Sequence, residues 1–266
     1  NRISTFVEQD KPIEFVMLGF PFKSINIRDK VNGIVPDMAE KATLDNFTAF
    51  NERVTDFYHK GVNFNIVSDG FIFNQLLGVH DNVVVDYKEQ SLNMVTGPVQ
   101  FYDATDFYNR HTTVNQIRAK IVEQFGITHE EIEQKVLFNL DDNMQYRGMI
   151  RFMGEELAMG SYSSGNQLHK AAKALAKEMM FVNEAYSNLV RKEFGNMIRL
   201  SMHPSINNGS KYSFKLIPGE NTKHSAWHSV LVVKDNELMT MHKKDAIAAG
   251  YDVVTKNNKP YYFIAN

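Results

Sequence analysis

Residues 198–203 carry side chains that are well suited to bind an anion. The segment reads Ile-Arg-Leu-Ser-Met-His and is predicted to be a β-strand, in which successive side chains alternate between two faces. Arg199, Ser201 and His203 therefore share one face. A guanidinium group can contact a phosphate or carboxylate through two parallel hydrogen bonds, so this face suits an anionic substrate.

A second predicted strand, residues 212–217, adds two lysines. Lys211, Ser213 and Lys215 alternate with apolar residues and share one face. If the two strands pair as an antiparallel hairpin, their polar faces merge into one surface with cations, hydroxyl groups and no acid. The same alternation is equally typical of the solvated outer face of a β-meander, so the spacing leaves both interpretations open.

Two histidines are the candidate proton-transfer groups, because the ordinary pKa of imidazole lies close to neutral pH. His228 follows Trp227 and precedes a predicted strand, residues 229–234. If that strand runs antiparallel in the same meander, His228 lies near His203 at the edge of the basic face. Lys215 is the next candidate for proton transfer. The structural alternative is that His203 caps a strand and His228 packs against Trp227.

Two loops at predicted strand ends add further candidates. Residues 19–24 read GFPFKS and offer backbone N–H groups, the Lys23 ammonium and the Ser24 hydroxyl, which suit a phosphate or carboxylate. Residues 68–70 offer the Asp69 carboxylate, a group able to orient a histidine or to hold a substrate amine. Ordinary strand-to-helix turns explain both loops as well, since neither matches a Walker or dinucleotide motif.

These loops are positioned by a predicted βαβ unit. Residues 13–18 form a buried strand, a helix of about six turns begins near Asp37 and stops before Gly61, and residues 64–67 form the next strand. Such strands pair in parallel with a right-handed crossover. Their carboxyl ends then lie at one edge of the sheet, where ligands of open α/β sheets bind. Residues 83–85, three valines, are a third strand candidate.

The middle of the chain, about residues 105–195, is predicted to be helical. Thr112 or Thr113 caps a helix that runs to Phe125, Thr128 starts the next one through a capping box with Glu131, and residues 166–193 form the longest helix.

The last third is predicted to form strands. A turn at residues 207–209 separates the first two, and a short helix at 244–249 and a hairpin turning at Asn257-Asn258 follow. The pattern predicts one α/β domain over residues 1–266, with a Rossmann-like, mainly parallel sheet, a helical insertion and an antiparallel C-terminal extension.

Composition narrows the classes of function. The chain has 266 residues, 43% of them hydrophobic, and a net charge of −2, so bulk charge does not favour nucleic acid or an anionic membrane as a partner. It has no cysteine, which removes disulfides, thiolate nucleophiles and Cys-ligated metals. With no visible signal peptide or apolar span of about 20 residues, a cytoplasmic protein is expected. HExxH and GxSxG motifs are absent from the sequence.

Five separated segments resemble one known family. KPIEFVMLGFPFKS, PDMAE, YHKGVNFNIVSDGFIF, IRLSMHP and AWHSVLVV occur in the order found in the pyoverdine/dityrosine biosynthesis family, which contains the bacterial isonitrile synthases. The resemblance runs from about residue 11 to residue 263 and is weakest between about 94 and 146. Many relatives carry proline before the Trp-His pair, where this chain has Ala226.

The resemblance implies a reaction. Isonitrile synthases convert the amino group of an aromatic L-amino acid, tyrosine or tryptophan, into an isonitrile for secondary metabolism, with ribulose 5-phosphate as carbon donor. It implies a carbon–carbon lyase type of enzyme that needs no metal or nucleotide cofactor. It also implies that the product passes to a downstream Fe(II)/2-oxoglutarate-dependent oxygenase.

Ten residues form the resulting candidate site. The catalytic candidates are His203, His228, Asp69 and Lys215, and the substrate-binding candidates are Lys23, Ser24, Phe22, Arg199, Ser201 and Trp227. In this interpretation the sugar phosphate lies against the Arg199 face, with Lys23 reaching in from the first loop. The alternative is a non-catalytic relative that binds a sugar phosphate or an amino acid. The sequence does not determine which aromatic amino acid is used.

Overall fold

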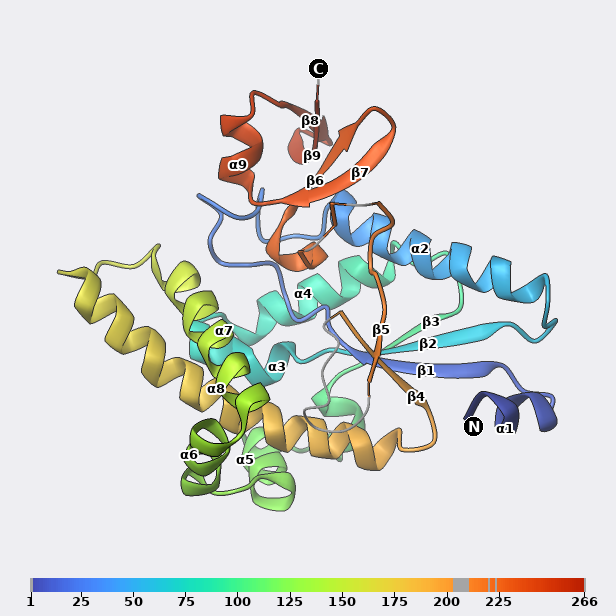
Figure 1. The fold of residues 1–266 in the computed structure, drawn as a ribbon, viewed down its shortest axis with the longest axis horizontal. Helices are drawn as coiled ribbons and strands as arrows, with labels where there is room; N and C mark the ends of the chain where they lie inside the picture. Colours follow the sequence, from blue (N-terminus) through green and yellow to red (C-terminus); the bar gives the residue numbers. More distant parts are fainter. Residues whose placement is uncertain (1, 203–210, 220, 223, 266) are drawn as a thin grey trace.

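The computed structural model describes residues 2–202, 211–219, 221–222 and 224–265. At its centre is a five-stranded sheet with the order β3-β2-β1-β4-β5, in which neighbouring strands pair in parallel (Figure 1). The strands are β1 (Ile13–Leu18), β2 (Val62–Val67), β3 (Val99–Tyr102), β4 (Ile198–Ser201) and β5 (Tyr212–Ser213). The expected α/β class is therefore confirmed.

The predicted βαβ unit is present. α2 (Met38–Thr55) connects β1 to β2, and the two strands pair in parallel along their whole length. The start of α2 is fixed by a capping box, because Asp37 accepts from Ala39 N while the Glu40 carboxylate accepts from Asp37 N. This capping box holds Glu40 in the interior, where its carboxylate contacts Lys23 in the loop of residues 19–24.

Helices cover both faces of the sheet. Figure 1 shows α2 and α4 (Asp81–Leu92) on one side, and α5 (Val114–Phe125) and α8 (Gly165–Glu193) on the other. Side-chain caps at Thr113 and Thr128 confirm two predicted helix starts. The other helices of this part are α1 (Arg2–Glu8), α3 (Gly70–Phe73), η1 (Asn74–Leu77), η2 (Ala104–Phe107), α6 (His129–Phe138) and α7 (Leu140–Leu157). None of the helices in the described residues is long and apolar enough to cross a membrane.

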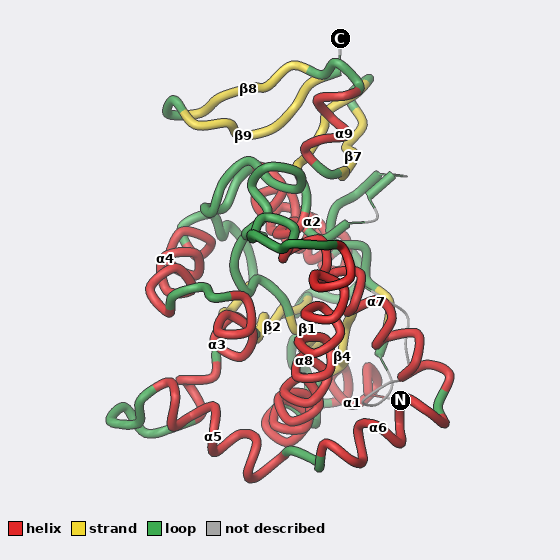
Figure 2. Tube along the Cα trace, turned by 90° about the vertical axis from the view of Figure 1, so that its left-hand side faces the viewer, coloured by secondary structure: helices red, strands yellow, loops and turns green. Residues whose placement is uncertain are grey.

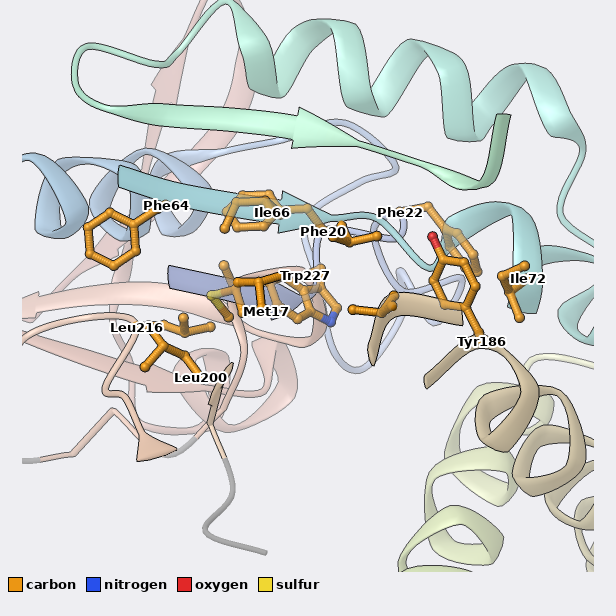
Figure 3. Close-up of a cluster of buried hydrophobic side chains, with 14 of the residues drawn as sticks. Met17, Phe20, Phe22, Phe64, Ile66, Ile72, Tyr186, Leu200, Leu216 and Trp227 are labelled. Atoms are coloured by element: carbon orange, nitrogen blue, oxygen red, sulfur yellow. The ribbon is translucent and has the colours of Figure 1, made fainter. Parts of the chain in front are cut away.

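A continuous apolar core fills the space between the sheet and its helices. Figure 3 shows Met17 of β1 and Ile66 of β2 together with Phe20 and Trp227, and all four residues are buried. Each large side chain of this kind contributes on the order of 1.5–3 kcal/mol when it leaves water. The loop after β1 is therefore anchored by its own aromatic residues.

A second, four-stranded sheet follows the parallel one. It has the order β7-β6-β9-β8, and Figure 2 shows this end of the chain standing apart from the central sheet. Its two hairpins are antiparallel, whereas β6 and β9 pair in parallel. The predicted turn at Asn257 and Asn258 is confirmed, with φ of 52° and 59°. The elements are η3 (Ala226–His228), β6 (Val230–Lys234), β7 (Glu237–Met241), α9 (Lys243–Ala248), β8 (Asp252–Lys256) and β9 (Lys259–Ile264).

Three details of the predicted strands are wrong. Val83–Val85 lies in α4, where Val84 is buried and Val85 is 41% exposed, the one-sided burial of a surface helix. The segment 212–217 is a strand only at Tyr212–Ser213, and it pairs with β4 in parallel instead of as an antiparallel hairpin. The strand after His228 belongs to the second sheet and not to the sheet that holds Arg199. The predicted turn at 207–209 lies outside the described residues.

Candidate active site

The loop after β1 and the turn after β2 pack against each other, as their positions at neighbouring strand ends predict. Ser68 Oγ donates to Phe20 O at 2.9 Å. A Cβ on Gly70 would lie 2.3 Å from Pro21 O, so only glycine permits this approach. Phe20 has φ of 54°, a left-handed conformation that costs a bulky residue on the order of 1–2 kcal/mol. The two loops thus form one closely packed wall at the carboxyl edge of the sheet.

Asp69 presents a carboxylate with an unused acceptor. Its Oδ1 is buried and has no hydrogen-bond partner among the described residues. Burial raises the pKa of this carboxyl group to about 7. The neighbouring Ser68 O accepts a 2.7 Å hydrogen bond from the Tyr186 hydroxyl of α8, and Figure 3 shows Tyr186 beside Phe22 and Ile72. Asp69 Oδ1 can therefore accept a hydrogen bond from a donor that the described residues do not supply.

Lys23 lies in a buried network of charges. Its Nζ donates to both carboxylate oxygens of Glu40 at 2.9 and 2.7 Å and to Ala226 O at 3.0 Å, and it lies 3.0 Å from Asp37 Oδ1. Burial alone lowers the pKa of the Lys23 ammonium, but the charges of Asp37 and Glu40 raise it by a larger amount. The pKa of Lys23 therefore lies above its usual value. The side chain is 0% exposed. This geometry disagrees with the expected contact between Lys23 and a substrate phosphate.

Ser24 joins the same loop to the helical segment. Its hydroxyl lies 2.8 and 2.7 Å from the two carboxylate oxygens of Glu156, a fully buried residue of α7. Glu156 also accepts from Lys30 Nζ at 2.8 Å. The Ser24 backbone N–H donates to Trp227 O at 2.8 Å. Ser24 therefore serves as a junction between β1, α7 and η3.

His228 is held next to this junction. Its Nδ1 lies 3.0 Å from Ser225 Oγ, and its ring packs on Phe152 with 4.8 Å between the ring centroids. Burial lowers the pKa of His228 well below its usual value, and the nearby Lys30 and Lys23 lower it further. His228 is thus neutral near pH 7 and can act as a base or as a hydrogen-bond partner.

Arg199 belongs to a cluster of cations on the α8 side of the sheet. Arg199 Nη2 donates to Ser187 Oγ of α8 at 3.2 Å. The parallel register of Leu200 with Tyr212 places Lys211 beside Arg199 on the same face, so the polar faces do merge although the strands are not antiparallel. Burial together with the charge of Arg191 lowers the pKa of Arg199 to about 10.

The same causes act on Lys211. Burial, and then the charges of Arg199 and Arg191, lower the pKa of Lys211 to about 8. The charge of Glu184, which pairs with Lys135 at 3.0 Å, acts in the opposite direction and raises the pKa of Lys211. A cavity of about 900 Å³ borders Arg199 and Arg191, and aromatic side chains form much of its wall. Arg199 and Lys211 thus lie near each other and near Arg191, and the cavity borders the two arginines.

The remaining predicted residues have different environments. Ser201 pairs in register with Ser213. Lys215 is exposed beyond the end of β5, so the structure does not bring it into a buried site. Phe22 is buried. Trp227 packs on Phe20 and so closely on Gly19 that a Cβ there would lie 2.8 Å from the indole. His203 lies outside the described residues.

Sequence reasoning missed several residues of this region. Glu40, Tyr87 and Glu156 complete the buried networks around Lys23 and Ser24, and Tyr87 donates to Glu40 Oε1 at 2.8 Å. Glu40 had a local signal, since it stands three residues after the helix cap Asp37. Glu156 has none, because it meets Ser24 across a separation of 132 residues.

An open cleft of about 810 Å³ lies beside the junction, between α7, the start of α8 and the loop that holds Lys30. Arg147 and Arg151 of α7 and Lys173 of α8 line it, and no ion pair joins these three side chains to an acid in the described part of the chain. His242, which follows β7 and precedes α9, also lines it.

Comparison with known proteins defines the class to which this fold and site belong. Residues 3–254 match the family described as "Pyoverdine/dityrosine biosynthesis protein", so the chain belongs to this family. The crystal structure of the PvcA protein from Pseudomonas aeruginosa has the same fold, with a TM-score of 0.92 and 26% sequence identity. The match covers 100% of this chain and 89% of that one.

Two relatives extend the comparison to named enzymes. The L-tyrosine isonitrile synthase of Xenorhabdus nematophila is 31% identical over 92% of this chain and 75% of its own length. The L-tryptophan isonitrile synthase AmbI2 of Fischerella ambigua is 29% identical over 98% of this chain and 80% of its own length. The family resemblance expected from the five sequence segments is thus confirmed.

Proposed function

We propose that this chain is an isonitrile synthase that converts the amino group of L-tyrosine or L-tryptophan into an isonitrile. The observation that carries the proposal is the similarity to tyrosine and tryptophan isonitrile synthases over 92% and 98% of the chain. Ribulose 5-phosphate is the proposed carbon donor, and the product is a substrate for a downstream Fe(II)/2-oxoglutarate-dependent oxygenase.

Asp69 is the proposed partner of the substrate amine. Its buried Oδ1 lacks a hydrogen-bond partner in the described residues, and a bound ammonium group would supply both the hydrogen bond and the opposite charge. The charge would also lower the raised pKa of Asp69 and favour the ionised carboxylate. In return, Asp69 is able to take a proton from the amine before the amine attacks a carbonyl group.

Arg199 and Lys211 are the proposed ligands of the donor phosphate. Burial and the repulsion from Arg191 lower the pKa values of both groups, and the negative charge of a bound dianion would offset that repulsion. The two proposed subsites both border α8, since Ser187 contacts Arg199 and Tyr186 contacts the backbone next to Asp69. A sugar phosphate bound at Arg199 would extend its carbonyl end along this part of α8.

His228 is the proposed proton-transfer group, together with His203. Condensation of an amine with a ketone gives a carbinolamine, which loses water to form an imine, and both steps move protons. The lowered pKa of His228 keeps its imidazole in the base form at neutral pH. Ser225 Oγ at Nδ1 fixes the ring so that the other nitrogen is available to a substrate.

The deciding experiment is a turnover assay. The purified protein is incubated with ribulose 5-phosphate and tyrosine or tryptophan in turn, and the isonitrile is sought by mass spectrometry. We expect one of the two amino acids to give the product, and His228→Asn to lower kcat by about 10²–10⁴-fold in a folded protein. Thermal stabilisation by both compounds without any product would instead identify a non-catalytic binding protein.

A further inference from the structure

His228 is the last residue of η3, a very short helical turn. η3 spans three residues, and its N-cap Ser225 makes no side-chain capping bond. Its local hydrogen bonds all involve Ser225: His228 N donates to Ser225 O at 3.1 Å, Ser229 Oγ donates to Ser225 O at 2.8 Å, and Ser225 Oγ lies 3.0 Å from His228 Nδ1. A turn of this size does not fix its own position in the molecule. What fixes the position of His228 must come from other segments.

The loop after β1 supplies this support through two consecutive residues. Lys23 Nζ donates to Ala226 O at 3.0 Å, and Ser24 N donates to Trp227 O at 2.8 Å. These are the two carbonyl groups that directly precede His228. The Trp227 indole, which lies within 2.8 Å of where a Cβ on Gly19 would stand, adds a packing constraint from the same loop.

Lys23 is itself immobilised on the opposite side. Glu40 and Asp37, at the start of α2, accept its other N–H groups at 2.7 to 3.0 Å. An ammonium group has three N–H donors, and the four acceptors around Nζ use all of them. Lys23 therefore ties the His228 turn to the first turn of α2. Its ammonium group has no N–H left to donate to a ligand.

We propose that Lys23 is a positioning residue, which holds the turn Ala226–His228 against α2 and thereby sets the place of the His228 imidazole. The role of His228 rests on the proposed function, but the tether itself does not. This assignment replaces the substrate contact expected from the sequence. It also explains why a lysine stands at a position without access to solvent.

The test compares two double variants, Lys23→Met/Glu40→Gln and Lys23→Gln/Glu40→Gln. The Glu40→Gln change removes one of the two carboxylates that would otherwise lose their cation, and the other, Asp37, is the same in both double variants. Met and Gln have similar sizes, but only Gln keeps N–H donors for Ala226 O. Trp227 is the single tryptophan of the chain, so intrinsic fluorescence reports on the turn directly and without any substrate.

In the Met variant we expect a changed Trp227 emission spectrum and greater quenching by acrylamide. We also expect kcat to fall about 10–10²-fold, the effect of misplacing a reacting group by about 1 Å, with KM for the sugar phosphate within about threefold of wild type. In the Gln variant, the Trp227 fluorescence and kcat should both return part of the way to their wild-type values. Lys41→Met, which removes a lysine of α2 that pairs with Asp45 near the surface, is the control and should change neither.

Two results would overturn the proposal. A KM for the sugar phosphate raised tenfold or more at unchanged kcat would identify Lys23 as a phosphate ligand (about 1.4 kcal/mol per tenfold change). An unchanged Trp227 spectrum with unchanged kcat would show that the turn is held by other contacts. If the Met variant does not fold, the Gln variant is judged by the same criteria. If wild type makes no isonitrile, the proposed function fails, while the fluorescence comparison still decides the tether.

Discussion

The chain places cations in two contrasting environments. Lys23 is fully buried and has two carboxylates within 3.0 Å, so its charge is neutralised inside the fold. Arg199 and Lys211 are partly buried on the other side of the sheet, next to Arg191, and their pKa values are lowered to about 10 and about 8. Burial acts on all three, but among the described residues Lys23 alone of the three has carboxylates within ion-pair distance.

This difference separates structural charges from binding charges. A buried ion pair is strongly destabilised when one partner is removed, because the other charge stays behind without compensation. A cluster of like charges is instead destabilising by itself and is relieved by an anion from solution. Under the proposed function, Lys23 belongs to the first kind and Arg199 belongs to the second.

The largest expected effect is on stability. Lys23→Met leaves Glu40 and Asp37 without their cation, and we expect the free energy of unfolding to fall by about 3–5 kcal/mol. Arg199→Ala removes a charge that has no carboxylate partner within ion-pair distance in the described residues, so the loss should be at most about 1 kcal/mol. Urea unfolding of both variants measures the two values. Equal losses would contradict the distinction drawn between the two environments.

The next effect is on substrate affinity. Arg199→Ala should raise KM for ribulose 5-phosphate by an amount equal to about 1.5–3 kcal/mol, the range of a hydrogen bond to a charged group. Lys215→Ala is the matched control, because this lysine is exposed beyond the end of β5 and should leave KM unchanged. Steady-state kinetics with the sugar phosphate varied at saturating amino acid measures both. A larger effect at Lys215 than at Arg199 would place the phosphate elsewhere.

Local patterns predicted much of the fold. The capping residues Thr113 and Thr128, the βαβ unit and the Asn257-Asn258 hairpin are encoded within short windows, and all are confirmed. Strand alternation placed Lys211 and Lys215 on one face, but Lys211 comes to lie beside Arg199 through a parallel register and not through the expected antiparallel hairpin. It could not reveal the direction of pairing, because alternation has the same period in parallel and antiparallel sheets.

Local sequence patterns did not predict which residues the candidate side chains contact. Lys23 is close to Glu40 in sequence, but its contact with Ala226 spans 203 residues, and that of Ser24 with Glu156 spans 132. The short loop GFPFKS contains the residue types of an anion site, and nothing in its spacing shows that the charge is already satisfied. Such a residue is assigned by the three-dimensional contacts that satisfy it, which depend on the packing of distant segments.

The smallest expected effect is a pH dependence of anion binding at Lys211. Its pKa in the folded protein is about 8, below the ordinary value of 10.5, so the ammonium form that attracts an anion is present below pH 8 and is lost as pH rises through 8. Between pH 7.5 and 9.5 inorganic phosphate stays mainly dianionic, and we expect its affinity to fall about five- to tenfold, the contribution of one charged contact. Thermal shifts at a series of phosphate concentrations measure this. Lys211→Met should bind more weakly at pH 7.5 and lose the pH dependence, whereas Lys215→Met should behave as wild type. An equal pH dependence in Lys211→Met would assign the titrating group to another residue.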